Sequence, residues 1–147
     1  MTKILVDTTV LLGWRSANDR YHDAASAIVA GIDEGDLPDG VVLTPILQEL
    51  LKHVQGEMGK PEATRTLDSL VHSPNFEIVP LGEEVHEHGR MIWQLHNLLE
   101  LPDALMVAYM RRRNIPFLYS FDGENSNRQK FERLQDVTRL NAAVDPY

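Results

Sequence analysis

The hydrophobic residues of this sequence fall into short apolar runs that alternate with longer segments of helical period. The apolar runs predict β-strands at residues 4–6, 41–44, 76–81, 116–122 and 137–140. Apolar positions three or four apart predict helices at 22–36, 44–58, 61–71, 83–99 and 101–114, and a polar helix is expected before the last strand. Strands that alternate with helices in this way pair in parallel and are covered on both faces. We therefore expect a three-layer α/β domain with a short, mostly parallel central sheet, spanning residues 1–147 as a single domain.

The composition indicates a soluble protein of the cell interior. The 147 residues suffice to bury a sizeable core, and the absence of cysteine excludes disulfides, thiolate nucleophiles and cysteine-bound zinc. No run approaches the roughly 18 apolar residues of a membrane span, and the first apolar stretch is too short for a signal peptide. We therefore expect a cytoplasmic protein that does not contact a membrane. The net charge of −8 opposes broad adhesion to nucleic acid, although a metal ion and a local basic patch can offset this repulsion at one site.

Three aspartates share one context, in which an apolar strand ends or an apolar helix begins. Asp7 follows the first strand, Asp122 ends the strand that begins at residue 116, and Asp103 lies in the first turn of a helix. In parallel α/β sheets these places meet at one edge, where ligands bind. Glu49, in the first turns of the helix after the second strand, approaches the same edge. Carboxylates gathered in this way repel one another unless a cation binds among them, and their hard oxygen atoms favour Mg²⁺ or Mn²⁺.

Four stretches of the sequence together resemble the PIN-domain ribonucleases, and among them the VapC-like toxins of toxin–antitoxin pairs. The stretches are ILVDTTVLL (residues 4–12), TPILQE (44–49), LPDALMVA (101–108) and SFD (120–122). They occur in the order of the family and span nearly the whole chain. The resemblance implies a PIN-like α/β/α domain and a nuclease that hydrolyses RNA phosphodiester bonds with Mg²⁺ or Mn²⁺, leaving a 5′ phosphate and a 3′ hydroxyl.

The resemblance also implies roles for individual residues. The four acids of the family, which are catalytic and hold one or two metal ions, are matched by Asp7, Glu49, Asp103 and Asp122. Small hydroxyl residues that orient the carboxylates or the scissile phosphate are matched by Thr8 and Ser120. A divalent ion held by carboxylates lowers the pKa of bound water and stabilises the leaving oxygen, so this chemistry needs no His or Ser nucleophile.

Two departures from the family pattern bear on the site. Thr9 stands where the family more often has Asn or Ser, so a supporting hydrogen bond can differ. Residues 123–127 are more polar than usual, which leaves open whether Asp122 or Glu124 is the last acid.

Other polar residues have weaker interpretations. Asp7 taken alone also suits the N-cap of a helix that begins at Thr8. Arg15 and Arg20 follow the first strand and are candidates for contacts with RNA, although they also suit ordinary surface charges. The basic run 111–113 ends a helix, where cations interact with the helix dipole and with free carbonyl groups.

The resulting functional hypothesis is a metal-dependent endoribonuclease that forms a homodimer and is blocked by a small antitoxin protein. Two alternatives keep the same fold: a non-catalytic PIN-like module that binds RNA or protein, and an RNA-processing nuclease with no antitoxin. A third is an acidic pocket like that of response regulators, which needs a lysine that follows a late strand. We see no such lysine in the sequence pattern.

Overall fold

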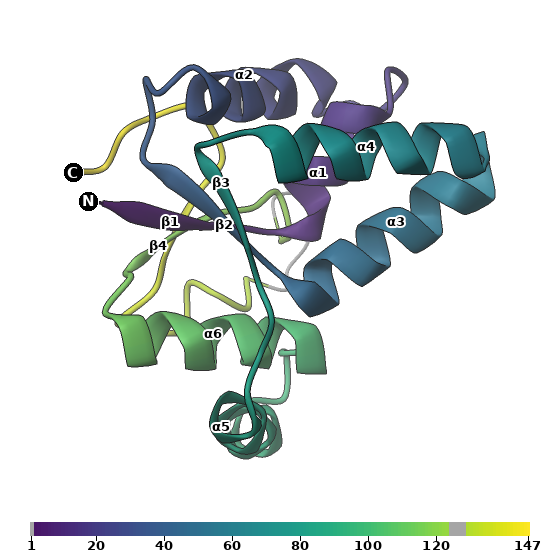
Figure 1. Cartoon of the computed structure of the whole chain (residues 1–147). Coiled ribbons are helices and arrows are strands. Elements are labelled where there is room, and N and C mark those ends of the chain that lie inside the picture. Colours follow the sequence, from purple (N-terminus) through teal and green to yellow (C-terminus); the bar gives the residue numbers. More distant parts are fainter. Residues whose placement is uncertain (1, 124–128) are drawn as a thin grey trace.

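The central sheet consists of five parallel strands in the order β3-β2-β1-β4-β5, in a computed structural model that describes residues 2–123 and 129–147 (Figure 1). The strands are β1 (Lys3–Val6), β2 (Asp39–Leu43), β3 (Phe76–Val79), β4 (Phe117–Tyr119) and β5 (Thr138–Leu140). The parallel sheet predicted from the sequence is confirmed. Its strand order also excludes the response-regulator alternative, because that fold orders its strands 2-1-3-4-5.

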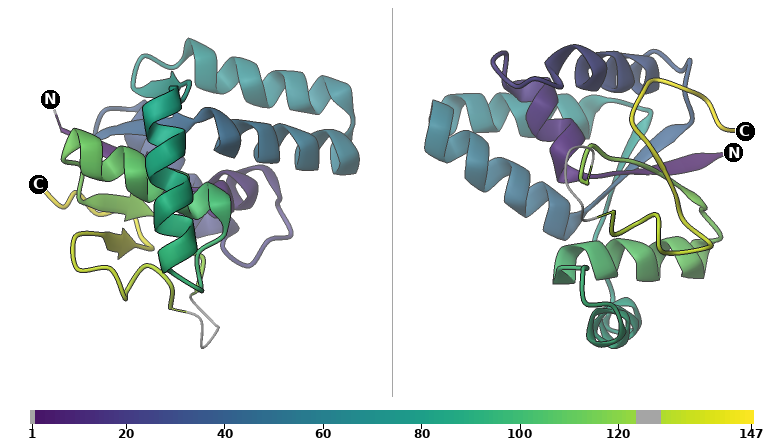
Figure 2. Two further views of the ribbon diagram at one scale, coloured as in Figure 1. Left: turned by 90° about the horizontal axis from the view of Figure 1, so that it is seen from below. Right: turned by 180° about the vertical axis from the view of Figure 1, so that it is seen from behind.

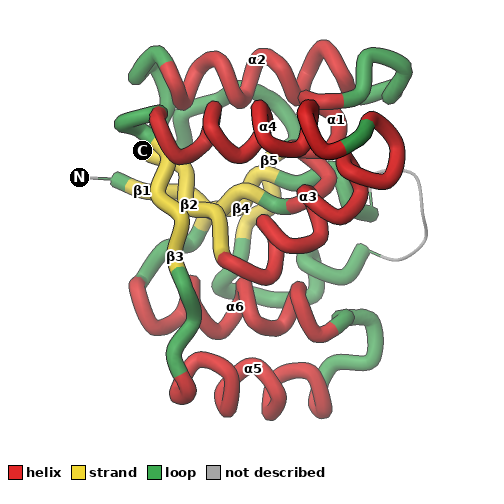
Figure 3. The backbone as a smooth tube through the Cα atoms, turned by 45° about the vertical axis from the view of Figure 1, so that its right-hand side comes forward, coloured by secondary structure: helices red, strands yellow, loops and turns green. Residues whose placement is uncertain are grey.

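The helices of the described residues form a layer on each face of the sheet. They are α1 (Thr8–Arg15), α2 (His22–Asp33), α3 (Thr44–Met58), α4 (Lys60–His72), α5 (Glu83–Leu95) and α6 (Leu101–Arg113). The first four lie on one side of the sheet, while α6 lies on the other side with α5 outside it (Figures 1 and 3). None of these helices has the length and apolar character that a membrane crossing needs.

Helix α6 is buried on all sides because it lies between the sheet and α5. Every residue from 103 to 110 is buried. A helix in such a place must be apolar around its whole circumference, and the sequence ALMVAYM at 104–110 meets this requirement. The helix begins with Pro102 in its first turn and ends at Asn114, whose φ of 56° is left-handed. Asp103 is the first residue of this buried stretch, so its carboxylate lies in the interior.

Strand β1 lies at the centre of the sheet and carries Asp7 at its end. Ile4, Leu5 and Val6 are fully buried. Leu5 pairs with Val41 of β2 on one side and with Leu118 of β4 on the other. Because β1, β2 and β4 run in the same direction, the residues that follow them meet at one edge of the sheet.

Several element boundaries differ from the sequence prediction. The helix predicted at 83–99 ends at Leu95, and a turn follows in which the Leu99 N–H donates to the His96 carbonyl at 3.2 Å. The helix predicted at 22–36 ends at Asp33, before Gly35 adopts a left-handed φ of 84°. The strands predicted at 76–81 and 116–122 are shorter, at Phe76–Val79 and Phe117–Tyr119.

The polar helix predicted before the last strand is wrong for residues 129–137, which form turns and no helix. Residues 124–128 lie outside the described part of the chain. The segment 129–137 passes beside α6 on its way to β5 (Figure 2). Lys130 contacts Asp103 in the first turn of α6, and Asp136 contacts Arg111 in its last turn. Contacts with α6 and the burial of Phe131, Leu134 and Val137, rather than helical hydrogen bonds, therefore position this segment.

The packing of α5 against α6 predicts opposite effects for two Gly→Ala substitutions. A Cβ at Gly89 in α5 would lie 2.6 Å from Leu105 Cδ2 and 3.3 Å from Leu105 Cα, whereas nothing lies within 4 Å of one at Gly56 in α3. We expect Gly56→Ala to stabilise the protein by ~0.5–1 kcal/mol through helix propensity. We expect Gly89→Ala to destabilise it by about 1 kcal/mol, because crowding outweighs that gain. Urea denaturation of both variants measures the difference, and equal stabilisation by both would contradict the close approach of α5 to α6.

Candidate active site

Asp7 lies at the junction of β1 and α1 and is buried there. The residue is 4% exposed and caps α1, because its Oδ1 accepts a hydrogen bond of 2.8 Å from the backbone N–H of Thr8. Its own N–H donates to the carbonyl of Tyr119 at 3.0 Å, which continues the pairing of β1 with β4. The N-cap interpretation is therefore confirmed. It accounts for one carboxylate oxygen and leaves Oδ2 to other partners.

Two hydroxyl groups hold the second carboxylate oxygen of Asp7. Ser120 Oγ donates to Oδ2 at 2.7 Å, and Thr9 Oγ1 donates to it at 3.3 Å. Both hydroxyls also accept hydrogen bonds of 3.0 Å from the backbone after β4, Ser120 from the Asp122 N–H and Thr9 from the Phe121 N–H. Each hydroxyl therefore joins Asp7 to the segment that carries Asp122. Thr9, which departs from the family pattern, makes this supporting hydrogen bond with its threonine hydroxyl.

A lysine that the sequence analysis did not single out joins Asp103 to Asp122. Lys130 Nζ lies 2.7 Å from Asp103 Oδ2 and 2.6 Å from Asp122 Oδ2. Asp103 and Lys130 are 5% and 9% exposed, and Asp103 Oδ2 also accepts the Glu100 N–H at 2.9 Å. The chain has a single lysine after Lys60. Four acids at one edge need a compensating cation, and this requirement is the signal that could have pointed to Lys130.

Glu49 is connected to the other acids through Thr8. The hydroxyl of Thr8 donates to Glu49 Oε2 at 3.1 Å. Thr8 is buried whereas Glu49 is exposed, so Glu49 lies at the rim. These contacts form one acidic network, whose members in order of contact are Glu49, Thr8, Asp7, Ser120, Asp122, Lys130 and Asp103. All six residues predicted as catalytic or supporting belong to it. Glu124, the alternative last acid, lies outside the described residues.

Burial and mutual repulsion shift the pKa values of the acidic network. Burial raises the pKa of Asp7 to about 6, the Ser120 hydrogen bond opposes this shift, and the charges of Asp103 and Asp122 add to it. Burial also raises the pKa of Asp103, although the hydrogen bond from Lys130 opposes the rise. Burial disfavours the Lys130 ammonium, but hydrogen bonds and charges from Asp103 and Asp122 outweigh it and raise the Lys130 pKa. The lysine is therefore charged at neutral pH, and the carboxylates retain an excess of negative charge.

The composition of the acidic network suits a divalent cation. Carboxylate oxygens are the ligands that Mg²⁺ and Mn²⁺ prefer, and four carboxylates exceed the charge that one ammonium can neutralise. As they stand, no three Asp, Glu or His side chains of the described residues lie close enough together to hold one ion. The ammonium of Lys130 occupies the place between two of these acids. The residues thus fit a divalent ion in chemical type and in charge.

The two arginines predicted as RNA contacts differ in where they lie. Arg15 points to α4, where its guanidinium forms an ion pair of 2.8 Å with Glu62. The Arg20 guanidinium lies 4.8 Å from the centre of the Tyr21 ring, which stacks on Phe121 with ring centroids 4.5 Å apart. Phe121 directly precedes Asp122. Arg20 is therefore linked to the acidic network through two stacked rings. Arg15 is instead paired with Glu62, which is not a member of the network.

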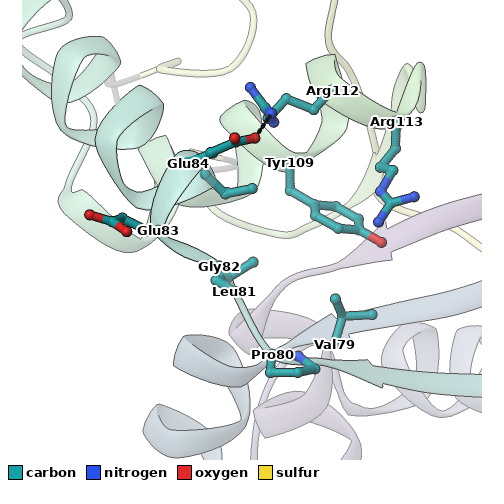
Figure 4. Close-up of a pocket in the computed structure, with 10 residues that line it drawn as sticks. Val79, Pro80, Leu81, Gly82, Glu83, Glu84, Tyr109, Arg112 and Arg113 are labelled. Carbon is teal, nitrogen blue, oxygen red and sulfur yellow. Dashed lines mark hydrogen bonds and ion pairs between the residues drawn. The ribbon is translucent and has the colours of Figure 1, made fainter.

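The basic run at 111–113 lies at the opposite end of α6 from Asp103. Arg111 and Arg112 form ion pairs of 2.7 and 2.5 Å with Asp136 and Glu84. A cavity of about 420 Å³ opens beside this end of the helix, lined by residues 79–85 together with Tyr109, Arg112 and Arg113 (Figure 4). None of its lining residues belongs to the acidic network. Arg113 lies 5.7 Å from the centre of the Tyr109 ring. The contacts of this run are thus local ones with acidic and aromatic side chains, whereas the helix-end interpretation named the helix dipole and free carbonyl groups.

The raised pKa of Asp7 predicts that Asp7→Asn stabilises the protein when divalent ions are removed by a chelator. The folded state of the wild type binds a proton that the unfolded state releases between about pH 4 and 6, so its stability falls as pH rises through this window. The loss amounts to about 3 kcal/mol above pH 6. Asparagine has no charge to bury, and its amide can still donate to the hydroxyls of Thr9 and Ser120.

Thermal unfolding at pH 4 and pH 7.5 measures this effect. We expect Asp7→Asn to exceed the wild type in stability at pH 7.5 and to differ little from it at pH 4. Asp136→Asn is the control, because Arg111 lowers the pKa of this acid and the substitution should destabilise slightly at neutral pH. A wild type that is the more stable protein at pH 7.5 would contradict the cost assigned to the Asp7 charge.

Comparisons with known proteins agree with this arrangement. The model of the PIN domain family matches residues 4–131. VapC20 of Mycobacterium tuberculosis, described as a toxin that cleaves the sarcin–ricin loop, is 22% identical with a TM-score of 0.71, over 82% of this chain and 91% of that chain. A toxin–antitoxin complex from Klebsiella pneumoniae is 18% identical with a TM-score of 0.67, over 97% of this chain and 98% of that chain.

VapBC2 from Rickettsia felis, crystallised with a DNA fragment from its promoter, has a TM-score of 0.68 at 12% identity, over 95% of this chain and 98% of that chain. No curated protein sequence gives a match. At these identities the solved structures establish the fold, and the family match covers most of the sequence. PIN domains are typically ribonucleases that use metal ions. The match runs from β1, which directly precedes Asp7, to the segment that carries Lys130. Because it covers most of the sequence, this chain belongs to the PIN domain family.

Proposed function

We propose that this protein is an endoribonuclease that depends on Mg²⁺ or Mn²⁺ and acts as the toxin of a toxin–antitoxin pair. The observation that carries the proposal is the acidic network at the end of β1 and β4. There hydrogen bonds and ion pairs connect Asp7, Asp103 and Asp122 in one network, with more negative charge than Lys130 can neutralise. A site that serves structure alone has no reason to bury this excess, because apolar residues of similar volume would be at least as stable.

The carboxylates of Asp7, Glu49, Asp103 and Asp122 would hold the metal ion. A bound divalent ion would lower the pKa of a water molecule and neutralise the phosphate oxygens of the scissile bond. Ser120 and Thr9 fix the orientation of the Asp7 carboxylate and tie it to the backbone of the Asp122 segment. Thr8 orients Glu49 in the same way from the first turn of α1. These residues support Asp7 and Glu49 and do not react themselves.

An RNA substrate is supported by the family and by the surroundings of the site. Arg20 stands at the acidic edge on the stacked rings of Tyr21 and Phe121. An arginine in this place suits contact with a phosphate beside the scissile one. Its positive charge would offset, at this place, the repulsion of RNA by a protein with a net charge of −8. Arg15 is the second candidate, and it would need to exchange Glu62 for phosphate.

A small antitoxin is the proposed protein partner, and a homodimer is the proposed assembly. Solved structures with this fold include complexes of toxins with their antitoxins. An antitoxin that covers the acidic edge would need to supply positive charge to the carboxylates. The alternative of an RNA-processing nuclease without an antitoxin has the same acids, so partner tests rather than site geometry separate the two.

The nuclease proposal predicts that RNA cleavage requires a divalent ion and Asp103. Purified protein, stripped by a chelator and supplied with Mn²⁺, should cleave single-stranded and hairpin RNAs to leave 5′ phosphates. We expect Asp103→Asn to lower the cleavage rate by at least ~100-fold, since even loss of a group that supports a metal ligand costs 10–100-fold. Asp136→Asn makes the same chemical change at the other end of α6 and should retain full activity.

Calorimetric titration with Mn²⁺ checks the same proposal without knowledge of the substrate. Binding by the wild type and by Asp136→Asn, with loss of binding in Asp103→Asn, is the expected pattern. Equal and feeble binding by all three proteins, together with intact RNA, would refute the nuclease and favour a non-catalytic module that binds RNA or protein.

The toxin assignment has a separate test in cells. Expression of the wild type in a bacterial host should arrest growth, and Asp103→Asn should not. Co-expression of a small protein encoded beside this chain should restore growth and co-purify with it. Cleavage of RNA in vitro with no effect on growth would instead support an RNA-processing nuclease.

A further inference from the structure

The position of Lys130 suggests how many metal ions the acidic network takes. Its ammonium lies within 2.7 Å of carboxylate oxygens from two acids, Asp103 and Asp122, which are 19 residues apart in the sequence. A cation shared between two carboxylates lies where one ion of a two-metal site would bind. In such sites the ions lie roughly 3.5–4 Å apart and share ligands.

The lysine is held in this place by the protein core. Lys130 is 9% exposed, and the next residue, Phe131, is fully buried. The ammonium lies 5.6 Å from the centre of the Phe131 ring. Leu134 and Val137 are also buried and fix the rest of the segment. Withdrawal of the ammonium would leave the two carboxylates facing each other with no cation between them.

Charge distinguishes the two sides of the acidic network. Asp103 and Asp122 share the ammonium, whereas Asp7 receives only hydroxyl and backbone N–H donors. A divalent ion placed between Asp103 and Asp122 would meet the ammonium at short range in a buried site, where repulsion is strong. An ion beside Asp7 would find a carboxylate that no cation contacts among the described residues.

We infer that Lys130 takes the place of a second metal ion, so that the acidic network holds one divalent ion, with Asp7 among its ligands. The inference rests on the proposed nuclease function and specifies its metal content. Lys130 is in this sense a positioning residue: it holds Asp103 and Asp122 together and neutralises part of their charge. A single ion with a fixed ammonium beside it then faces the phosphate.

The number of bound ions in the wild type is the first test. Mn²⁺ titrated into chelator-treated protein should bind with a stoichiometry of one per chain by calorimetry. The electron paramagnetic resonance spectrum of the saturated protein should be that of isolated Mn²⁺ ions. Two ions per chain with a spin-coupled spectrum would overturn the inference, and this measurement depends on no variant.

Substitutions of Lys130 supply the second test. Lys130→Gln removes the charge but keeps a donor for one carboxylate, and we expect it to take up a second Mn²⁺ and show spin coupling. Lys130→Arg keeps the charge and should still bind one ion. Lys3→Met is the matched control, because it breaks a lysine–carboxylate pair of equal length, 2.7 Å to Glu77, at the other end of β1. It should behave as the wild type does.

The outcomes separate this inference from the proposed function. Two coupled ions in the wild type, or an unchanged single ion in Lys130→Gln, would contradict the role of Lys130 while the nuclease proposal stands. No Mn²⁺ binding by any of these proteins would refute the metal-dependent nuclease and the inference with it. Circular dichroism of Lys130→Gln with and without Mn²⁺ shows that the compared proteins are folded.

Discussion

Repulsion between carboxylates at one edge of the sheet is the constraint on which the acidic network depends. Parallel strands bring Asp7 and Asp122 to the same edge, and the buried start of α6 adds Asp103. Burial raises the pKa of Asp7 to about 6, and the charges of Asp103 and Asp122, which water screens poorly in this interior, add to the rise. Different groups offset the repulsion at different acids: hydroxyl and backbone N–H groups at Asp7, and an ammonium at Asp103 and Asp122.

Helix α6 contributes to the core and to the acidic network. Its middle fills the space between the sheet and α5, so its apolar side chains form much of the core on that face. Its first turn presents Asp103, and its last turn holds Asp136 through Arg111. The segment that brings Lys130 to the acids is thus fixed to α6 near both of its ends. Changes that shift this helix would alter the spacing of the acids as well as the packing of the core.

The sequence was most informative where the signal is local. The apolar strand before Asp7, the proline near the start of α6 and the helix of Thr44–Met58 all follow from residues next to one another. The predicted site residues came together because strand ends in a parallel sheet share an edge. Lys130 was missed because it lies in a polar segment without periodicity, and its importance arises from contacts across the fold. The polar helix expected there was wrong for residues 129–137 for the same reason, since ion pairs with α6 and the burial of Phe131, Leu134 and Val137 hold that segment.

The central position of β1 has a consequence for the order in which the protein is made. One edge of β1 pairs with β2 within the first 43 residues, but its other edge waits for β4, and Asp7 waits for Ser120. Lys130 comes later still in the sequence. During synthesis from the N-terminus, β1 therefore lacks its second neighbour until residues 117–119 have emerged from the ribosome. The acidic network cannot assemble before then, because Asp7 has neither Ser120 nor the segment that carries Lys130 beside it.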